Sequence, residues 1–165
     1  DSFYITQWGS DDIINLARDG QLRVIASGFA DPTGIAVTED TIYVANNASA
    51  RRAIEWLEMS SLTPTPNPLV SGLQKVTNIT LGPDGMLYIA YSLGTRGVVG
   101  RLDPEICKTL ESGCTNTQVE LLLWTDLPAP LAGLTITPDM RLFVHTMFGT
   151  EIYWLDLEQE EEEAS

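Results

Sequence analysis

The chain has 165 residues, 44% of them hydrophobic, which is enough for one domain with a real core and too little for two large ones. It carries 9 Lys and Arg against 23 Asp and Glu, a formal net charge of −14, and a surface this acidic repels nucleic-acid phosphates and anionic lipid. No apolar run approaches the roughly 18 residues of a membrane span, so neither nucleic acid nor a membrane span is expected. Because the chain opens at Asp1 without Met, a removed leader or a longer parent polypeptide is expected.

The first predicted strands form an incomplete unit. The stretch "FYITQWGSDDIINL", residues 3–16, is typical of an aromatic strand, a loop and a second strand. No apolar strand precedes it. The chain is therefore expected to begin within a repeating unit.

Three later segments share one pattern: an apolar strand, a tight turn and a second strand with a central aromatic residue. They are "PTGIAVTEDTIYVANN", "VTNITLGPDGMLYIAYS" and "LAGLTITPDMRLFVHTM". The aromatic residues Tyr43, Tyr88 and Phe143 set a period of about 45 and then about 55 residues. Repeats of this length made of short strands indicate the blades of a β-propeller.

Each unit contains two further predicted strands. A third strand ends in a Leu-acid pair, as in "AIEWLE", "VVGRLD" and "EIYWLD", and a fourth precedes each segment, as in "LRVIASGF", "NPLVSGL" and "VELLLWTDL". Two strands plus three sets of four give fourteen, or about three and a half four-stranded antiparallel blades. The predicted fold class is all-β.

The expected organisation is a run of propeller blades over residues 1–157 and an acidic tail over 158–165. The blades divide into a partial blade, 1–28, and the repeats 29–72, 73–125 and 126–157. Three architectures fit: a fragment of a larger ring, a four-bladed ring with one incomplete blade, or two copies in one seven-bladed ring. A fragment is favoured, because a first strand is missing before Asp1 and an outer strand after Asp156; solenoids and sandwiches are the alternatives at the level of fold.

The two cysteines of "CKTLESGC", Cys107 and Cys114, favour a local disulfide, with reduced loop thiols as the alternative. A disulfide indicates an oxidising compartment, so a secreted, extracellular or periplasmic location is expected. The triplets Asn47-Ala48-Ser49 and Asn78-Ile79-Thr80 make Asn47 and Asn78 candidate glycosylation sites.

The turn and strand motifs resemble those of the NHL and gluconolactonase-like superfamily of six- or seven-bladed propellers, over about residues 3–157. The resemblance rests on Pro-x-Gly-Ile at 32–35, Pro-Asp-Gly-x-Leu-Tyr at 83–88 and Arg-Leu-Asp at 101–103. These motifs encode turns and core layers, so they indicate the blade rather than a function. Members include lactonases with a central divalent cation, lyases, quinone-dependent sugar dehydrogenases and binding platforms.

In such a fold the loops between fourth and first strands, and between second and third strands, gather on one face around the channel. The residues predicted to line this loop face are Trp8, Asp12, Asn46, Arg51, Arg52, Asn78, Tyr91, Arg96 and His145. Polar and aromatic mixtures of this kind are common at binding surfaces.

Asn78 is the sharpest candidate, because it stands where the other repeats have Gly34 and Gly133. Its oxygen could ligate Ca²⁺ or another divalent cation, with Asn46 and Asp12 as further oxygen donors. Alternatively, Asn replaces Gly in a left-handed backbone. The glutamate that the resemblance implies from another blade is not identifiable.

The remaining candidates have simpler interpretations. His145 could act as a general base or be a packing residue, and the pair Arg51-Arg52 could hold a carboxylate or phosphate or be solvated. Asp11-Asp12 is expected to form a turn. Trp8 could stack on a ligand, whereas the other tryptophans are expected to be core between blades: Trp56, Trp124 and Trp154.

Strong blade motifs with few catalytic groups predict a secreted or cell-surface binding or scaffold module without catalysis. It would present the loop face to a protein or glycan, or assemble with further copies or other chains. The alternative is a metal-dependent, lactonase-like hydrolase whose remaining ligands lie outside this chain. A quinone-dependent dehydrogenase ranks last, because it would need more basic and histidine residues.

Overall fold

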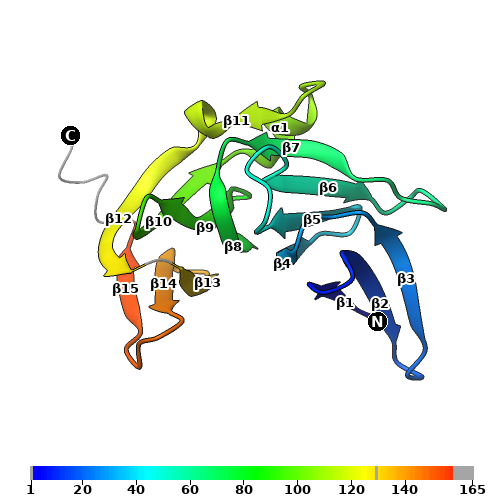
Figure 1. The fold of residues 1–165 in the computed structure, drawn as a ribbon, viewed down its shortest axis with the longest axis horizontal. Coiled ribbons are helices and arrows are strands. Elements are labelled where there is room, and N and C mark those ends of the chain that lie inside the picture. Colours follow the sequence, from blue (N-terminus) through cyan, green and yellow to red (C-terminus); the bar gives the residue numbers. More distant parts are fainter. Residues whose placement is uncertain (1, 129, 158–165) are drawn as a thin grey trace.

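The computed structural model describes residues 2–128 and 130–157, so the predicted acidic tail, 158–165, lies outside the described residues. All fourteen predicted strands are present and pair antiparallel within four sheets, which follow one another around a common centre (Figure 1). The described part of the chain contains no helix long and apolar enough to cross a membrane. The predicted all-β arc of propeller blades is confirmed.

Two sheets come from the first half of the chain. Sheet A consists of β1 (Ser2–Gln7), β2 (Asp12–Ala17) and β3 (Leu22–Ser27). Sheet B consists of β4 (Pro32–Val37), β5 (Thr41–Asn46), β6 (Ile54–Glu58), β7 (Asn67–Ser71) and the short β11 (Cys114–Thr115).

Two sheets come from the second half. Sheet C consists of β8 (Gln74–Leu81), β9 (Leu87–Leu93), β10 (Arg96–Leu102) and β12 (Glu120–Pro128). Sheet D consists of β13 (Leu131–Ile136), β14 (Arg141–Thr146) and β15 (Tyr153–Asp156).

The two end sheets each have three strands. β1 packs against β4 as β5 packs against β8, so β1 corresponds to the second strand of a blade. Sheet A thus has no described counterpart of β4, and sheet D has no described counterpart of β7 or β12. The sequence predicts both gaps.

Each sheet buries its apolar residues against the next, because alternate strand residues point to opposite faces. Between sheets A and B, the core includes Ile13, Phe29, Ile42 and Val44. A larger core lies between sheets B and C and a third between C and D. The aromatic ring of each second strand enters the following interface, as Tyr43 and Tyr88 show.

Hydrogen bonds also join the inner strands of successive sheets. Thr6 Oγ1 in β1 donates to the Thr33 carbonyl at 2.8 Å, and Thr33 Oγ1 donates to the Val76 carbonyl at 3.1 Å. The Asn47 amide donates to the same Val76 oxygen at 3.2 Å. These bonds run from sheet A through B to C, and they fix the positions of the channel-side strands.

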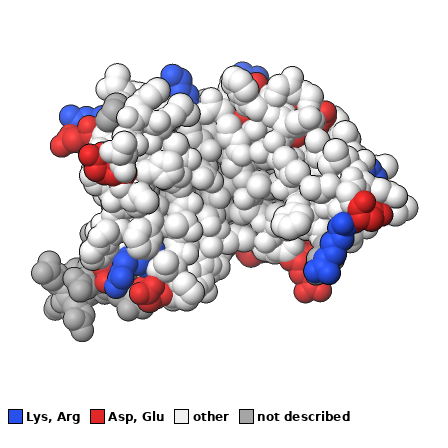
Figure 2. Space-filling view, turned by 90° about the horizontal axis from the view of Figure 1, so that it is seen from below, with Lys and Arg blue, Asp and Glu red and all other residues white. Residues whose placement is uncertain are grey.

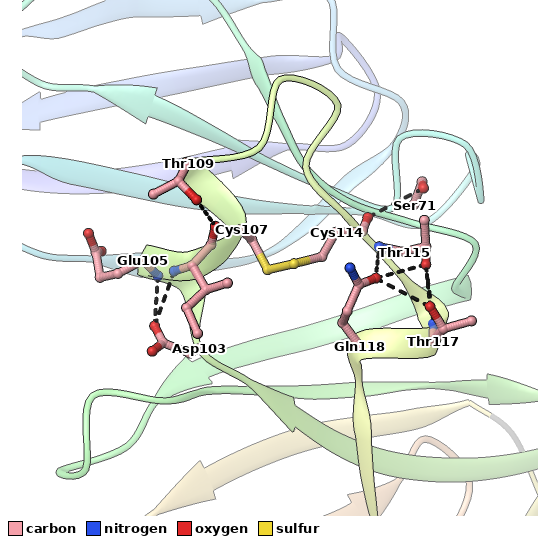
Figure 3. The surroundings of a disulfide bond; sticks show 10 residues. Ser71, Asp103, Glu105, Cys107, Thr109, Cys114, Thr115, Thr117 and Gln118 are labelled. Carbon is pink, nitrogen blue, oxygen red and sulfur yellow. Dashed lines mark hydrogen bonds between the residues drawn. A yellow bond between two sulfur atoms is a disulfide. The ribbon is translucent and has the colours of Figure 1, made fainter.

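The cysteine insertion folds back on sheet B. Cys107 and Cys114 form the predicted disulfide (Figure 3). The bond joins α1 (Pro104–Lys108) to β11, which pairs with β7 and leads into the 3₁₀ turn η1 (Asn116–Gln118). These three short elements were not expected from the sequence, since α1 and η1 depend on local caps and β11 depends on its pairing with β7.

Side-chain caps stabilise the two helical elements of the insertion, α1 and η1. The Asp103 carboxylate accepts from the Glu105 amide at 2.9 Å, and the Thr115 side chain caps η1 with Gln118 (Figure 3). Lys108 at the end of α1 lies over the ring of Trp56, 5.4 Å from its centroid. The insertion therefore covers the outer part of sheet B.

The tryptophan prediction is wrong for two of the three residues. Trp56 packs partly buried against the central core, but Trp124 and Trp154 are 54% and 61% exposed. Trp154 lies on the face of sheet D that points away from sheet C, under the Arg141 guanidinium, 5.1 Å from the ring centroid. Its burial would require another neighbour on that face.

The open side of the arc carries few charges. Figure 2 views the molecule from below relative to Figure 1 and shows a broad uncharged surface, with charged side chains around its margins. Charged side chains of both signs thus surround this face rather than cover it.

Candidate functional site

Asn46 and Arg52, predicted for the loop face, belong to a polar cluster between sheets A and B. Asn46 is fully buried; its oxygen accepts from the Ala30 amide at 3.0 Å, and its nitrogen donates to Glu55 Oε2 at 2.8 Å. Arg52 donates to both Glu55 oxygens and to the Gly28 carbonyl, each at 2.8 Å. The Glu55 hydrogen bonds raise the pKa of Arg52 further.

This cluster holds the chain together rather than presenting a ligand site. Since the oxygen of Asn46 is occupied and its side chain is buried, Asn46 is not placed to bind a cation. Its prediction as a face and metal residue is wrong for that reason. Glu55 is not among the predicted residues; its signal in the sequence is the Arg-x-x-Glu spacing after Arg52.

Asn78 does not replace glycine in a left-handed backbone. Positive φ angles occur instead at Asp31 (51°), three residues before Gly34, and at Lys75 (49°), three residues before Asn78. Asn78 lies within β8, where its own oxygen accepts from the Ile79 amide at 2.9 Å. The left-handed interpretation of Asn78 is therefore wrong.

Close packing explains the glycines that match Asn78. A Cβ on Gly34 would lie 2.7 Å from the backbone nitrogen of Ile79, so β4 can approach β8 this closely only with glycine there. A Cβ on Gly133 would collide with the imidazole of His145. Glycine at 133 thus makes room for the histidine ring.

Asn78 and His145 line one cavity of about 400 Å³ beside β13 and β14. His145 is exposed, and its Nδ1 lies 3.1 Å from the Thr146 carbonyl. The complete lining is Asn78, Gly133, Leu134, Thr135, Phe143, Val144, His145 and Ile152. The structure therefore brings two predicted residues together, in a mostly apolar setting.

Of Tyr91 and Arg96, both predicted for the loop face, only Arg96 is exposed. Tyr91 is buried in the core between sheets B and C, and burial raises the pKa of its phenol, so it is not a face residue. Arg96 is partly exposed and forms an ion pair with Asp126 at the β10–β12 end of sheet C. Exposed pairs of this kind add little stability.

Trp8 and Arg51 are exposed, in the turns that follow β1 and β5. Asp12 begins β2 and is half-buried. Asp11 lies in the preceding turn with a φ of 58°, and its carboxylate accepts from the Asp31 amide at 2.8 Å, as expected for a turn residue. Trp8 and Arg51 are thus the predicted residues most available for contact.

The structure disfavours both glycosylation candidates. The Asn47 side-chain nitrogen donates to the Val76 carbonyl, and Asn78 lies inside the inner strand β8. A glycan on Asn47 would displace its bond to Val76, and a glycan on Asn78 would displace its bond to the Ile79 amide.

The part of the chain that the structure describes does not supply a complete donor set for a metal. Among the described residues, no three His, Cys, Asp or Glu side chains form a cluster that could hold a metal ion. The predicted oxygen donors are separated, since Asn46 is in the buried polar cluster and Asn78 is in the cavity beside β13. These residues do not fit a divalent cation without further ligands.

Comparison with known proteins identifies the fold. No family model matches the chain, and no curated protein matches it. Among solved structures, a chain of the nidogen/laminin complex aligns with a TM-score of 0.72 and 19% identity, over 93% of this chain and 55% of that one.

Two enzymes align in a similar way. The gluconolactonase of Xanthomonas campestris has a TM-score of 0.64 and 18% identity, over 88% of this chain and 44% of the enzyme. Virginiamycin B lyase from Staphylococcus aureus has a TM-score of 0.59 and 16% identity, over 95% of this chain and 49% of the lyase. The chain thus spans about half the length of these structures, and the predicted resemblance to gluconolactonase-like propellers is confirmed at the level of the fold.

Proposed function

We propose that the chain is part of a secreted or cell-surface β-propeller module that binds a protein or glycan through its loop face. The observation that carries the proposal is that the predicted face residues fall into two groups, those that form hydrogen bonds inside the fold and those that are exposed. Asn46 and Arg52 are occupied in holding sheets together, whereas Trp8 and Arg51 are exposed in equivalent turns.

Trp8 and Arg51 offer complementary chemistry. An exposed indole presents a flat apolar surface with one polar edge, which suits a sugar ring or an apolar side chain. The Arg51 guanidinium can form paired hydrogen bonds to a carboxylate. Because both follow the second strand of a unit, they lie at the same end of their sheets. The disulfide is compatible with an extracellular or periplasmic location.

Binding to a panel of immobilised glycans and extracellular proteins tests this proposal. We expect Trp8→Ala and Arg51→Ala each to weaken any selected interaction by about 10-fold or more, since central aromatic and arginine residues dominate interfaces. Leu62→Ala, in an exposed position of the β6–β7 loop, is the control and should have no effect. Binding that neither Trp8→Ala nor Arg51→Ala weakens would contradict the proposal.

A metal-dependent hydrolase is the second candidate. It is favoured by the cavity that Asn78 and His145 share and by the fold likeness to a gluconolactonase. Its remaining ligands would lie outside this chain. Calorimetric titration with Ca²⁺ and a gluconolactone hydrolysis assay test it: stoichiometric metal binding with lactone opening, both lost in Asn78→Ala, would support the hydrolase and contradict a purely binding role.

A further inference from the structure

A cavity of about 390 Å³ lies between sheet A and the loop that joins β6 to β7. One wall is a row of polar side chains across sheet A: Tyr4 of β1 lies opposite Asn15 of β2, which lies opposite Arg23 of β3. Figure 1 shows β3 and the β6–β7 loop at the same end of the arc. Sites for small molecules have volumes of about 300–1,000 Å³, so this cavity is large enough for a small ligand.

The opposite wall is the β6–β7 loop, which hydrogen bonds hold near both ends. The Met59 amide donates to the Asp40 carbonyl at 2.8 Å, and the Asn67 side chain donates to the Thr65 carbonyl at 3.1 Å. The hydroxyl residues of the loop that line the cavity are Ser61, Thr63 and Thr65. The loop therefore adds hydroxyl groups to the polar row of sheet A.

Arg23 brings an unpaired positive charge to this cavity. Among the described residues it has no ion-pair or hydrogen-bond partner, whereas five other basic side chains pair with a carboxylate: Arg52, Arg96, Arg101, Lys108 and Arg141. No described Asp or Glu lines the cavity. In a chain with a net charge of −14, a cation without an acidic neighbour favours binding of an anion here.

The other polar groups of the lining are neutral. The Tyr4 phenol and the hydroxyls of Ser61, Thr63 and Thr65 can both donate and accept, and the Asn15 amide has two donor hydrogens and an acceptor oxygen. Within the described part of the chain, these side-chain groups have no hydrogen-bond partner. Such groups suit a ligand that carries several hydroxyls.

The charge of the ligand follows from the single cation. One guanidinium balances one carboxylate and can form two parallel hydrogen bonds to it. A phosphate monoester would instead bring about 1.5 to 2 negative charges to an acidic body. A carboxylate is therefore the better match to Arg23.

We propose that this cavity binds a sugar acid, whose carboxylate pairs with Arg23 and whose hydroxyl groups bond to the neutral polar groups of the lining. Half-buried apolar side chains supply contact for the faces of the sugar ring: Ile25, Met59 and Pro64. The site is separate from the loop face, because the β5–β6 turn with Arg51 lies at the other end of β6 from this loop.

The test uses the whole chain and two sugars that differ only at the last carbon. Methyl β-D-glucuronide has a carboxylate there, and methyl β-D-glucoside has a hydroxymethyl group. By calorimetric titration, we expect the glucuronide to bind with a Kd below about 10 mM and the glucoside to bind at least about 10-fold more weakly. Acetate, a carboxylate without the sugar, should also bind at least about 10-fold more weakly than the glucuronide.

Three variants locate the site. Arg23→Ala removes the cation and should weaken glucuronide binding by about 10-fold or more, to about the affinity of the glucoside; Arg23 is exposed, so the fold should be retained. Tyr4→Phe removes one hydroxyl and should weaken glucuronide binding by about 3-fold while keeping the preference over the glucoside. Arg96→Ala makes the same change in net charge in sheet C and is the matched control, which should bind as the unchanged chain does.

Three results would overturn the proposal. One is no saturable binding of the glucuronide up to about 10 mM. Another is glucuronide binding that Arg23→Ala does not weaken, or that Arg96→Ala weakens as much, since the sugar would then bind elsewhere or through net charge. The last is acetate binding as tightly as the glucuronide, because the cavity would then not select a sugar. Each result would leave the loop-face proposal standing, since the two sites share no residue.

Discussion

Sheet C, inside the arc, and sheet A, at its end, are built from the same repeat, yet their matching residues differ in burial. Ile89 follows Tyr88 in β9 and is fully buried, whereas Ile5 follows Tyr4 in β1 and is 39% exposed. Phe3 in sheet A is 68% exposed. The repeat determines which residues share a face of a sheet, and the neighbouring sheet determines whether that face is buried.

The difference is confined to the faces that lack a neighbour. On sheet A the outward face carries Phe3 and Ile5, paired with Leu16 and Ile14 of β2. Tyr4, on the opposite face, packs toward sheet B as expected. Sheets B and C, the inner sheets, have described neighbours on both faces, and they should therefore carry most of the stability.

Truncating the buried isoleucine should have the largest effect. Ile89→Ala removes side-chain atoms from a closed core and should lower the free energy of unfolding by about 2–5 kcal/mol. Ile5→Ala, the same change at the matching position of sheet A, should cost less than about 1 kcal/mol, because its side chain stays partly in water. Urea unfolding of both variants measures this, and equal losses would contradict the contrast between inner and end sheets.

Removing the disulfide should have the next largest effect. Replacing Cys107 and Cys114 by Ser opens a short loop that closes onto sheet B, and the chain-entropy model predicts a loss of about 2–3 kcal/mol. Thermal unfolding with and without reductant measures it. The unchanged chain in reductant should match the double variant without it; an unaltered midpoint in both would show that the insertion does not stabilise sheet B.

Replacing Gly34 by alanine adds one methyl group and should disrupt the contact between β4 and β8. Gly34→Ala places a Cβ 2.7 Å from the Ile79 nitrogen, so the strands must separate, at a cost of about 1–3 kcal/mol. Gly9→Ala is the control, because no heavy atom lies within 4 Å of its would-be Cβ. Denaturant titration should find the control unchanged; a neutral Gly34→Ala would mean that the inner strands are not closely packed.

The smallest expected effect is on the pKa of two carboxyl groups in turns, and it should be alike in an inner sheet and an end sheet. In sheet B, the Thr38 hydroxyl donates to Asp40 and lowers the pKa of its carboxyl; in sheet D, Thr137 lowers the pKa of Asp139. A carboxyl with a lower pKa in the folded state stabilises the fold above the unfolded value near 4, and this contribution is lost as pH falls through the folded pKa.

Carboxyl titration by NMR measures the effect. Thr38→Ala should raise the pKa of Asp40 toward its usual value and leave that of Asp139 unchanged, and Thr137→Ala should do the reverse. Because both carboxylates are fully exposed, little change in stability is expected. A pKa of Asp40 that does not move would show that the Thr38 bond is absent in solution.

The strands were predictable from sequence because the same strand pattern occurs in each repeat. Tyr43, Tyr88 and Phe143 mark the same strand, and alternation assigns the faces. The three elements of the cysteine insertion were not, because α1, β11 and η1 have no repeated counterpart. Neither was the exposure of Trp124 and Trp154, which depends on neighbouring sheets that no local pattern specifies.

The candidate site was harder to predict for a related reason. Strand position places Asn46 and Tyr91 near the loop face, but burial depends on packing between sheets, and both side chains turn inward. Glu55, which binds Arg52 and Asn46, lies mid-strand and is identifiable only once sheets A and B are assembled. By contrast, the structure brings Asn78 and His145 into one cavity, as their strand positions near the channel suggest.

Residue-resolved amide hydrogen exchange tests the central claim most directly, namely that sheets B and C are packed on both faces, whereas sheets A and D have a described neighbour on one face only. The amides of β5 and β9, which have described strands on both sides, should exchange only through global unfolding. Those of β1 and β15, at the end sheets, should exchange through local opening and be faster by orders of magnitude. Equal protection of β1, β5, β9 and β15, or slower exchange at the two ends, would contradict the account.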